Sequence, residues 1–246
     1  MVGSFVQGIT AYGRALEFIN RHRLWSYVLA PMLISLVLGL LVLSTAWAYS
    51  DDLGQWIMEK YPWQRGKSAL ESASSFLGGL IFVVFGLLVF RHVVMALSAP
   101  VMSPLSEKIE EIVTGRHGQV SFSVQKAIGD LVRGIRISLR NVLRELVLTL
   151  LLSLFGLIPV FSIFSAAGIF LLQSYYAGFG NIDFTLERHY GVRDAVRFVR
   201  RHAGLAIGNG VVFMLLLFTG IGFVLALPLG TVAATLETVR RLDGEN

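Results

Sequence analysis

The segments Phe155-Gly156-Leu157-Ile158-Pro159-Val160-Phe161 and Phe218-Thr219-Gly220-Ile221-Gly222-Phe223 decide the fold of this chain. Each lies between two apolar stretches and contains the Gly or Pro that marks a turn. A turn in water usually carries Asn, Asp, Ser or a charge, whereas these carry one Thr and otherwise apolar residues, Gly and Pro. Irregular backbone at membrane depth persists where protein covers it or where it lines a watery cavity. We therefore expect each turn to lie inside a membrane and to be covered by protein.

The composition is that of an integral membrane protein with a small soluble share. Of the 246 residues, 54% are hydrophobic and 15% are charged, whereas soluble domains have about 25% charged residues. The chain has no cysteine, which excludes disulfides, thiol catalysis and cysteine-ligated zinc. Its net charge of +5 is better explained by membrane orientation than by nucleic acid, and we expect no nucleic-acid partner.

Two charge-poor runs, residues 25–49 and 76–97, are each long enough to cross a hydrocarbon core of about 30 Å. The first carries two aromatic residues at each end, as an aromatic belt predicts. The segment 51–71 has four acids against three bases, whereas the flanking segments are basic. The positive-inside rule then predicts a multi-pass protein with both termini in the cytoplasm and residues 51–71 outside.

Two apolar hairpins follow, residues 141–176 and 204–237. Each is predicted to enter the membrane from the cytoplasmic side and to return to that side. Each arm has about 16 residues, or roughly 24 Å of helix, which is slightly short of the hydrocarbon core. Re-entrant hairpins and thin full spans both remain possible, and the dry turns favour re-entry. The run Gly204, Gly208 and Gly210 favours close helix packing.

Two amphipathic segments complete the predicted all-α integral membrane protein. Residues 3–20 suit a helix lying in the membrane interface, because their apolar residues form one stripe: Phe5, Val6, Ile9, Tyr12, Leu16 and Ile19. Residues 104–114 predict a second helix, with Ser103 as N-cap, Pro104 at its first position and Gly115 at its end. The fold class is thus two long transmembrane helices, two apolar helical hairpins and amphipathic interfacial helices.

The stretch Ala99-Pro100-Val101-Met102-Ser103-Pro104-Leu105-Ser106-Glu107, followed by Thr114-Gly115, resembles the CysZ family of bacterial sulfate transport proteins, part of the etoposide-induced membrane protein superfamily. The resemblance covers nearly the whole chain, including Pro31 and the segment around residues 183–189. It implies a bacterial inner-membrane location, the lipid bilayer and a small inorganic anion as partners, and a homo-oligomer.

The family's motif Gly-Leu-x-x-Glu here reads Ser103-Pro104-Leu105-Ser106-Glu107, with the Glu retained. The family's sulfate-binding arginine pair precedes the first span, and alignment to Pro31 puts Trp25 and Ser26 at those positions. Arg21 and Arg23 lie one turn earlier. The resemblance therefore implies these anion-binding candidates: Arg21, Arg23, Ser103, Leu105 and Glu107.

Each candidate has a plainer alternative. A helix N-terminus at Ser103 and Pro104 would offer free N–H groups to an anion, or it could be an ordinary capped helix. Arg21 and Arg23 could bind an anion that Glu107 helps to position, or they could be topology anchors.

The segment 183–189 and the residues that follow it carry the remaining charge. The charged side chains of 183–189 indicate a polar cytoplasmic connector with an ion-paired face. The arginines of residues 193–201 form a basic face for anionic lipid or, alternatively, an anion vestibule.

The sequence favours a permease or channel for a small oxyanion, which the resemblance identifies as sulfate. The alternative is a non-transporting membrane scaffold or lipid-organising protein of the same fold. Metalloprotease, serine-hydrolase, phosphate-loop and dinucleotide motifs do not occur in the sequence. We therefore expect no enzyme activity, no cofactor and no metal site.

Overall fold

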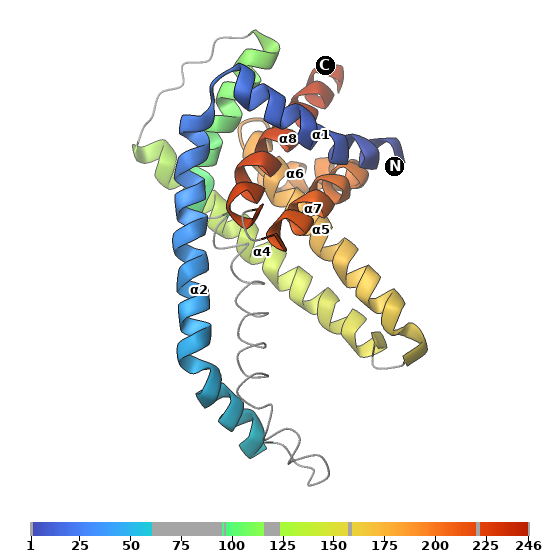
Figure 1. Cartoon of the computed structure of the whole chain (residues 1–246). Coiled ribbons are helices and arrows are strands. Elements are labelled where there is room, and N and C mark those ends of the chain that lie inside the picture. Colours follow the sequence, from blue (N-terminus) through green and yellow to red (C-terminus); the bar gives the residue numbers. More distant parts are fainter. Residues whose placement is uncertain are drawn as a thin grey trace. The chain divides into compact units, whose positions relative to one another are not determined.

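The computed structural model describes residues 2–60, 95, 97–115, 124–156, 159–219 and 222–245, and all regular structure in this part of the chain is helical. The expectation of an all-α fold is confirmed for these residues. A helical segment at 97–114, here called the 97–114 helix, precedes α4. Figure 1 labels the helices α1 (Val2–Arg21), α2 (Trp25–Lys60), α4 (Val124–Gly156), α5 (Ser162–Leu186), α6 (Val192–Arg201), α7 (Ala203–Leu217) and α8 (Gly222–Glu245). A short 3-10 helix, η1 (Pro159–Phe161), lies between α4 and α5.

The chain divides into two compact units, one of residues Met1–Ile34 and Met95–Asn246, the other of residues Ser35–Val94. In the first unit, α5 packs most extensively on α7. Helix α1 packs on α7 and α8, and α8 also packs on α5 and α7. The apolar core lies where these helices meet and includes Phe179, Ile182, Leu186, Leu205 and Val199.

Glycines allow these helices to approach one another closely. A side chain at Gly178 of α5 would collide with the backbone carbonyl of Ala206, and one at Gly210 of α7 would collide with that of Ser174. Gly208 lies against the backbone of α1 in the same way. The prediction that the glycine run of α7 serves close packing is confirmed for Gly208 and Gly210.

A buried polar network joins four helices at this crossing. Tyr12 Oη of α1 donates a hydrogen bond to the carbonyl of Asn209 on α7, at 2.9 Å. Asn181 Nδ2 of α5 donates to Asn209 Oδ1 at 2.8 Å, and Asn209 Nδ2 donates to the carbonyl of Gly230 on α8 at 3.0 Å. Because both asparagine side chains are fully buried, these bonds offset their desolvation.

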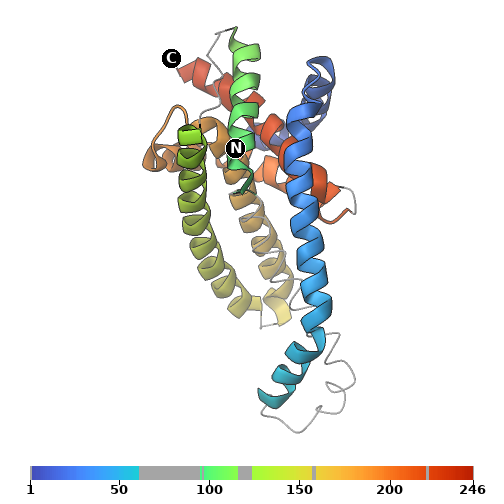
Figure 2. The same cartoon turned by 90° about the vertical axis from the view of Figure 1, so that its left-hand side faces the viewer.

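Helix breaks occur at both dry turns, as predicted. Between α4 and α5 the chain passes through η1, and between α7 and α8 it turns after Leu217. The two views show α4 and α5 side by side (Figures 1 and 2). The expectation that protein covers the turns is wrong for the described part of this chain, because Val160 is 75% exposed and Phe218 is 72% exposed.

The two hairpins differ in their surroundings. The distal part of the α4–α5 hairpin exposes large apolar side chains, with Ile163 79% and Phe164 74% exposed. In contrast, residues 226–239 of α8 are buried. The physical reason is composition: α7 and α8 carry small and hydroxyl-bearing residues that pack closely, whereas the end of α4 carries bulky leucines on several faces.

The predicted N-terminal helix is confirmed as α1, but the face of α1 that packs on the core is not the predicted apolar stripe. The side of α1 that faces the core presents mostly small residues, Gly8, Ala11 and Ala15, with Tyr12 and Ile19. The expected apolar stripe is therefore only partly buried, and Val6 and Leu16 stay exposed. Small residues form the packing face of α1 because they allow the backbones of α1 and α7 to approach closely.

The predicted span 25–49 lies inside α2, which continues to Lys60 without a break. The sequence contains no proline between Pro31 and Pro62 to end the helix earlier. The predicted span 76–97 lies outside the described residues except at 95 and 97. In the described chain, no single helix meets the length and hydropathy needed to cross a membrane alone, although α1 and residues 25–41 of α2, bent by 120°, meet them as a pair.

The close crossing of α5 and α7 leads to a stability prediction. Gly178→Ala and Gly210→Ala each force a methyl group into a neighbouring backbone, and we expect each to lower the free energy of unfolding by about 1–3 kcal/mol, or more if the helices separate. Thermal unfolding of the purified protein in detergent measures this change.

Gly13→Ala is the matched control, because the space around Gly13 in α1 is open. This change should be neutral or should stabilise the helix by up to about 1 kcal/mol. Equal effects of the Gly13 and Gly178 substitutions would contradict the close crossing.

Candidate functional site

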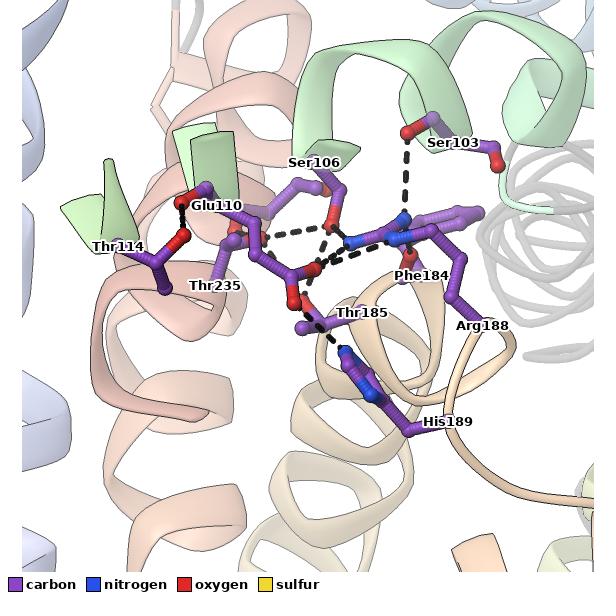
Figure 3. Close-up of polar contacts among 10 residues, drawn as sticks. Ser103, Ser106, Glu110, Thr114, Phe184, Thr185, Arg188, His189 and Thr235 are labelled. Carbon is purple, nitrogen blue, oxygen red and sulfur yellow. Dashed lines mark hydrogen bonds and ion pairs between the residues drawn. The ribbon is translucent and has the colours of Figure 1, made fainter. Parts of the chain in front are cut away.

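A polar cluster lies where the 97–114 helix meets the end of α5 and the middle of α8 (Figure 3). The 97–114 helix is continuous through Ser103 and Pro104, so the prediction of an N-cap at Ser103 is wrong. Helix geometry places Ser103, Ser106 and Glu110 on one face, since they are spaced by three and four residues. The predicted end is confirmed: Gly115 has a φ of +67° and its N–H donates to the carbonyl of Glu111 at 2.9 Å.

Arg188 is the centre of this cluster, and all five of its N–H donors are used. Its Nε and one Nη2 hydrogen donate to Glu110 Oε2, at 3.2 and 2.8 Å. The other Nη2 hydrogen donates to Ser106 Oγ at 2.9 Å. Nη1 donates to the carbonyls of Phe184 at 2.9 Å and Ser103 at 3.4 Å. Because a guanidinium has only five donors, Arg188 has no donor left for a ligand. Its role is to hold these helices together.

Glu110 joins Arg188 to the neighbouring histidine. Glu110 Oε1 lies 2.7 Å from His189 Nε2, while Oε2 receives the two bonds from Arg188 (Figure 3). Burial alone would raise the pKa of Glu110, but the hydrogen bonds from His189 and Arg188 and the positive charge of Arg188 outweigh it and lower the pKa from its usual value. The carboxylate is therefore charged at neutral pH and is held by charge-assisted bonds.

Three hydroxyl groups form a closed triangle beneath this ion pair. Ser106 Oγ lies 3.1 Å from Thr185 Oγ1 and 3.3 Å from Thr235 Oγ1, and the two threonine hydroxyls are 3.0 Å apart. All three side chains are fully buried and come from the 97–114 helix, α5 and α8. The triangle therefore fixes the registry of these three helices at one level.

A second buried ion pair ties α4 to the same part of α5. Arg133 Nη2 donates to Asp183 Oδ1 at 2.9 Å, and Arg133 Nε lies 3.9 Å from Glu187 Oε2. Burial raises the pKa of Asp183 to about 6, although the charge of Arg133 acts in the opposite direction. With the Glu110–Arg188 pair, this contact confirms the prediction that the charged side chains of 183–189 form an ion-paired face.

The sequence-predicted anion residues are not brought into one site by direct contacts. Arg21 and Arg23 are exposed, and their guanidinium groups make no hydrogen bond or ion pair with a described side chain. Leu105 is fully buried among apolar residues and Ser103 is buried with a hydroxyl that bonds to no described residue. Glu107 is partly buried. The expectation that Glu107 positions the two arginines has no contact among the described residues to support it.

The sequence interpretation missed Glu110 as the partner of Arg188. It started the helix at Pro104 and therefore gave weight to the motif residue Glu107, not to the face that carries Ser103, Ser106 and Glu110. The available signal was polar residues at helical spacing, which α8 also has at Thr231, Thr235 and Thr238.

Comparison with known proteins gives the family. The model of the family described as "Sulfate transporter CysZ/Etoposide-induced protein 2.4" matches residues 11–228. The chain belongs to this family. The resemblance of the sequence to CysZ proteins is thereby confirmed.

Curated relatives agree with this assignment. The "Sulfate transporter CysZ" of Pseudomonas aeruginosa (strain LESB58) is 26% identical over 242 residues, covering 95% of this chain and 94% of the relative. The protein of the same name from Pseudomonas fluorescens (strain Pf0-1) is 25% identical over 241 residues, covering 94% and 92%. The family is one of transporters.

The cluster predicts a large cost for removing Glu110. Glu110→Gln leaves Arg188 without its charged partner, and we expect the free energy of unfolding to fall by about 2–3 kcal/mol. The control is Asp194→Asn, which breaks an Arg197–Asp194 pair of similar length, 2.9 Å, between side chains that are 75% and 55% exposed. That change should cost no more than about 1 kcal/mol.

The effect of Glu110→Gln should also depend on pH. Because the folded pKa of Glu110 is lowered, its contribution to stability is present above the unfolded value of 4.5 and is lost as the pH falls through the folded pKa. Thermal unfolding from pH 7 to pH 3 should therefore show the parent and the variant converging in acid. A difference that stays constant over this range would contradict the charged role of Glu110.

Proposed function

We propose that this protein is an inner-membrane permease or channel for a small oxyanion, with sulfate as the cargo. The observation that carries the proposal is the family match over residues 11–228, together with relatives that bear the name sulfate transporter and align with this chain over 94% of their length. The absence of any phosphate-loop motif in the sequence favours passive or ion-coupled transport over transport driven by ATP.

The proposal includes a membrane arrangement. Residues 25–49 and 76–97 cross the bilayer, residues 3–20 lie in its interface, and residues 141–176 and 204–237 form the apolar hairpins of a single membrane domain. Both termini are in the cytoplasm of a bacterial cell. The exposed apolar side chains at the end of the α4–α5 hairpin support this arrangement, since a surface of this kind needs lipid or a second copy of the chain to cover it.

Arg21 and Arg23 remain the proposed residues of the anion entrance, with Ser103, Leu105 and Glu107 as the other members of the candidate set. The guanidinium groups of Arg21 and Arg23 are exposed and form no ion pair with a described carboxylate, so their donors are available to an oxyanion. Arg23 also has a φ of 54°, in the left-handed region that glycine adopts more easily. The presence of arginine at a backbone conformation that glycine would adopt with less strain supports a role for the Arg23 side chain.

The test is uptake of labelled sulfate into proteoliposomes. Exchanging Arg21→Gln and Arg23→Gln together removes charge-assisted contacts worth roughly 1.5–3 kcal/mol each, and we expect sulfate binding to weaken more than tenfold while insertion is retained. The control exchanges Arg136→Gln and Arg240→Gln, two exposed arginines outside the basic face of residues 193–201, for the same loss of charge.

Sulfate uptake that is the same in the Arg21/Arg23 variant as in this control would show that the two arginines are topology anchors. The absence of any sulfate uptake by the parent protein, when it is inserted and folded, would favour the alternative function. That alternative is a membrane scaffold or lipid-organising protein, and the lack of polar groups in the exposed α4–α5 turn is the observation that favours it.

A further inference from the structure

We propose that Arg140, Arg144 and Arg200, with the hydroxyl groups of Tyr175 and Tyr176, form a second binding site, which takes a tetrahedral oxyanion group. The group is either a free sulfate or phosphate ion or the phosphate of a lipid headgroup. This site is separate from the proposed entrance at Arg21 and Arg23, and its ability to bind does not depend on transport.

Aromatic side chains of α5 form one wall of this site. The guanidinium carbon of Arg140 on α4 lies 5.9 Å from the centroid of the Phe179 ring. The Tyr175 ring is 6.5 Å from Phe179 and 5.3 Å from Tyr176, centroid to centroid. Arg140 Nη1 also donates to Asn141 Oδ1 at 2.9 Å. These contacts hold Arg140 against α5 and still leave four of its five donors without a described partner.

Positive charge gathers around Arg140 from two helices. Arg144 follows it by one helical turn on α4, and Arg200 is at the end of α6. Burial, followed by the charges of Arg144 and Arg200, lowers the pKa of Arg140 from its usual value. Tyr175 and Tyr176 act electrostatically on the same guanidinium, so their hydroxyls lie within the same neighbourhood.

The arginines of this group have no ion pair with a described carboxylate, although two carboxylates lie near enough to act on the group electrostatically. Six other arginines of the described chain have an acidic partner within 4.0 Å, as Arg133 has Asp183 and Arg188 has Glu110. None of Arg140, Arg144 and Arg200 forms such a pair with a described side chain. The two nearby carboxylates are Asp183, on which the charge of Arg140 acts, and Glu145, which acts on Tyr176. Asp183 is already bonded to Arg133, and Glu145 is buried and makes a contact of its own, so the three arginines outnumber the negative charge around them.

Three like charges that repel one another are stabilised by an anion between them. Guanidinium groups recognise tetrahedral oxyanions through paired N–H donors, and tyrosine hydroxyls add further donors. Exposed apolar residues of α4, Leu143 and Val147, lie beside the cluster. In the membrane arrangement proposed above, the site would then be at the boundary between apolar core and headgroups, where a phosphate group is also found.

The experiment measures thermal stabilisation of the delipidated full-length protein in detergent. Sodium sulfate replaces sodium chloride at constant ionic strength, and a bound anion raises the unfolding temperature with its concentration. The test variant carries Arg144→Gln and Arg200→Gln, two exposed positions whose change leaves the Arg140 contacts in place. The control variant carries Lys108→Gln and Arg240→Gln, two partly exposed bases outside the basic face of residues 193–201. The parent, the test variant and the control variant are each made with and without Arg21→Gln and Arg23→Gln. Binding at the second site is thereby measured separately from binding at the proposed entrance.

A second titration separates the two sources of the oxyanion. Short-chain phosphatidylglycerol is compared with short-chain phosphatidylcholine in the same assay. We expect the apparent Kd of the test variant to rise about tenfold or more against the parent, while the control variant stays within about twofold of it. A loss confined to sulfate identifies a free ion, and a loss confined to phosphatidylglycerol identifies a lipid headgroup.

Two results would overturn the proposal. One is a test variant that responds to sulfate and to phosphatidylglycerol just as the control variant does. The other is a parent protein that neither sulfate nor phosphatidylglycerol stabilises beyond chloride and phosphatidylcholine. A variant with Arg140→Lys adds a check on geometry, since it keeps the charge but lacks paired donors and should bind more weakly than the parent.

Discussion

The rest of the first unit depends on the hydrogen bonds of one buried residue, Asn209. Its amide and its backbone carbonyl connect to Tyr12, Asn181 and Gly230, so that α1, α5, α7 and α8 meet at one point. A buried amide that loses a partner costs about 1–3 kcal/mol, which makes this registry of the four helices the favoured one. Glycine backbones around the crossing make the approach possible, because a larger residue there would push the helices apart.

The crossing positions α5, and α5 then carries the features related to function. One turn after Asn181, Thr185 enters the hydroxyl triangle, and just beyond the end of α5 Arg188 enters the ion pair with Glu110. In the second half of the helix, the Phe179 ring lies against Arg140 of α4, with Tyr175 and Tyr176 beside Phe179 in the same aromatic group. At its other end, α5 pairs with α4 to form the exposed apolar hairpin. A rigid polar core thus holds an apolar element that needs a membrane or a second copy around it.

Periodicity and turn chemistry predicted much of this fold from the sequence. The N-terminal helix, the breaks at both dry turns, the end at Gly115 and the use of glycines for packing all follow from local rules. The sequence did not predict that one hairpin is buried and the other exposed, since both are apolar. The small and hydroxyl-bearing residues of α7 and α8 that make the difference take effect only when these helices pack against their neighbours. It also missed the partner of Arg188, because a pair such as Glu110 and Arg188, 78 residues apart, leaves no local pattern. The motif residue Glu107 attracted the interpretation instead.

We propose that the polar core holds the α4–α5 hairpin in the hydrocarbon of the membrane. The chain has no cysteine, so a single Ile163→Cys carries one nitroxide label near the turn, with Arg197→Cys on α6 as a water-exposed reference. In proteoliposomes, the account predicts that the label at position 163 collides often with oxygen and rarely with a water-soluble nickel chelate. A label at position 163 that meets the nickel chelate as often as the label at position 197 would contradict it.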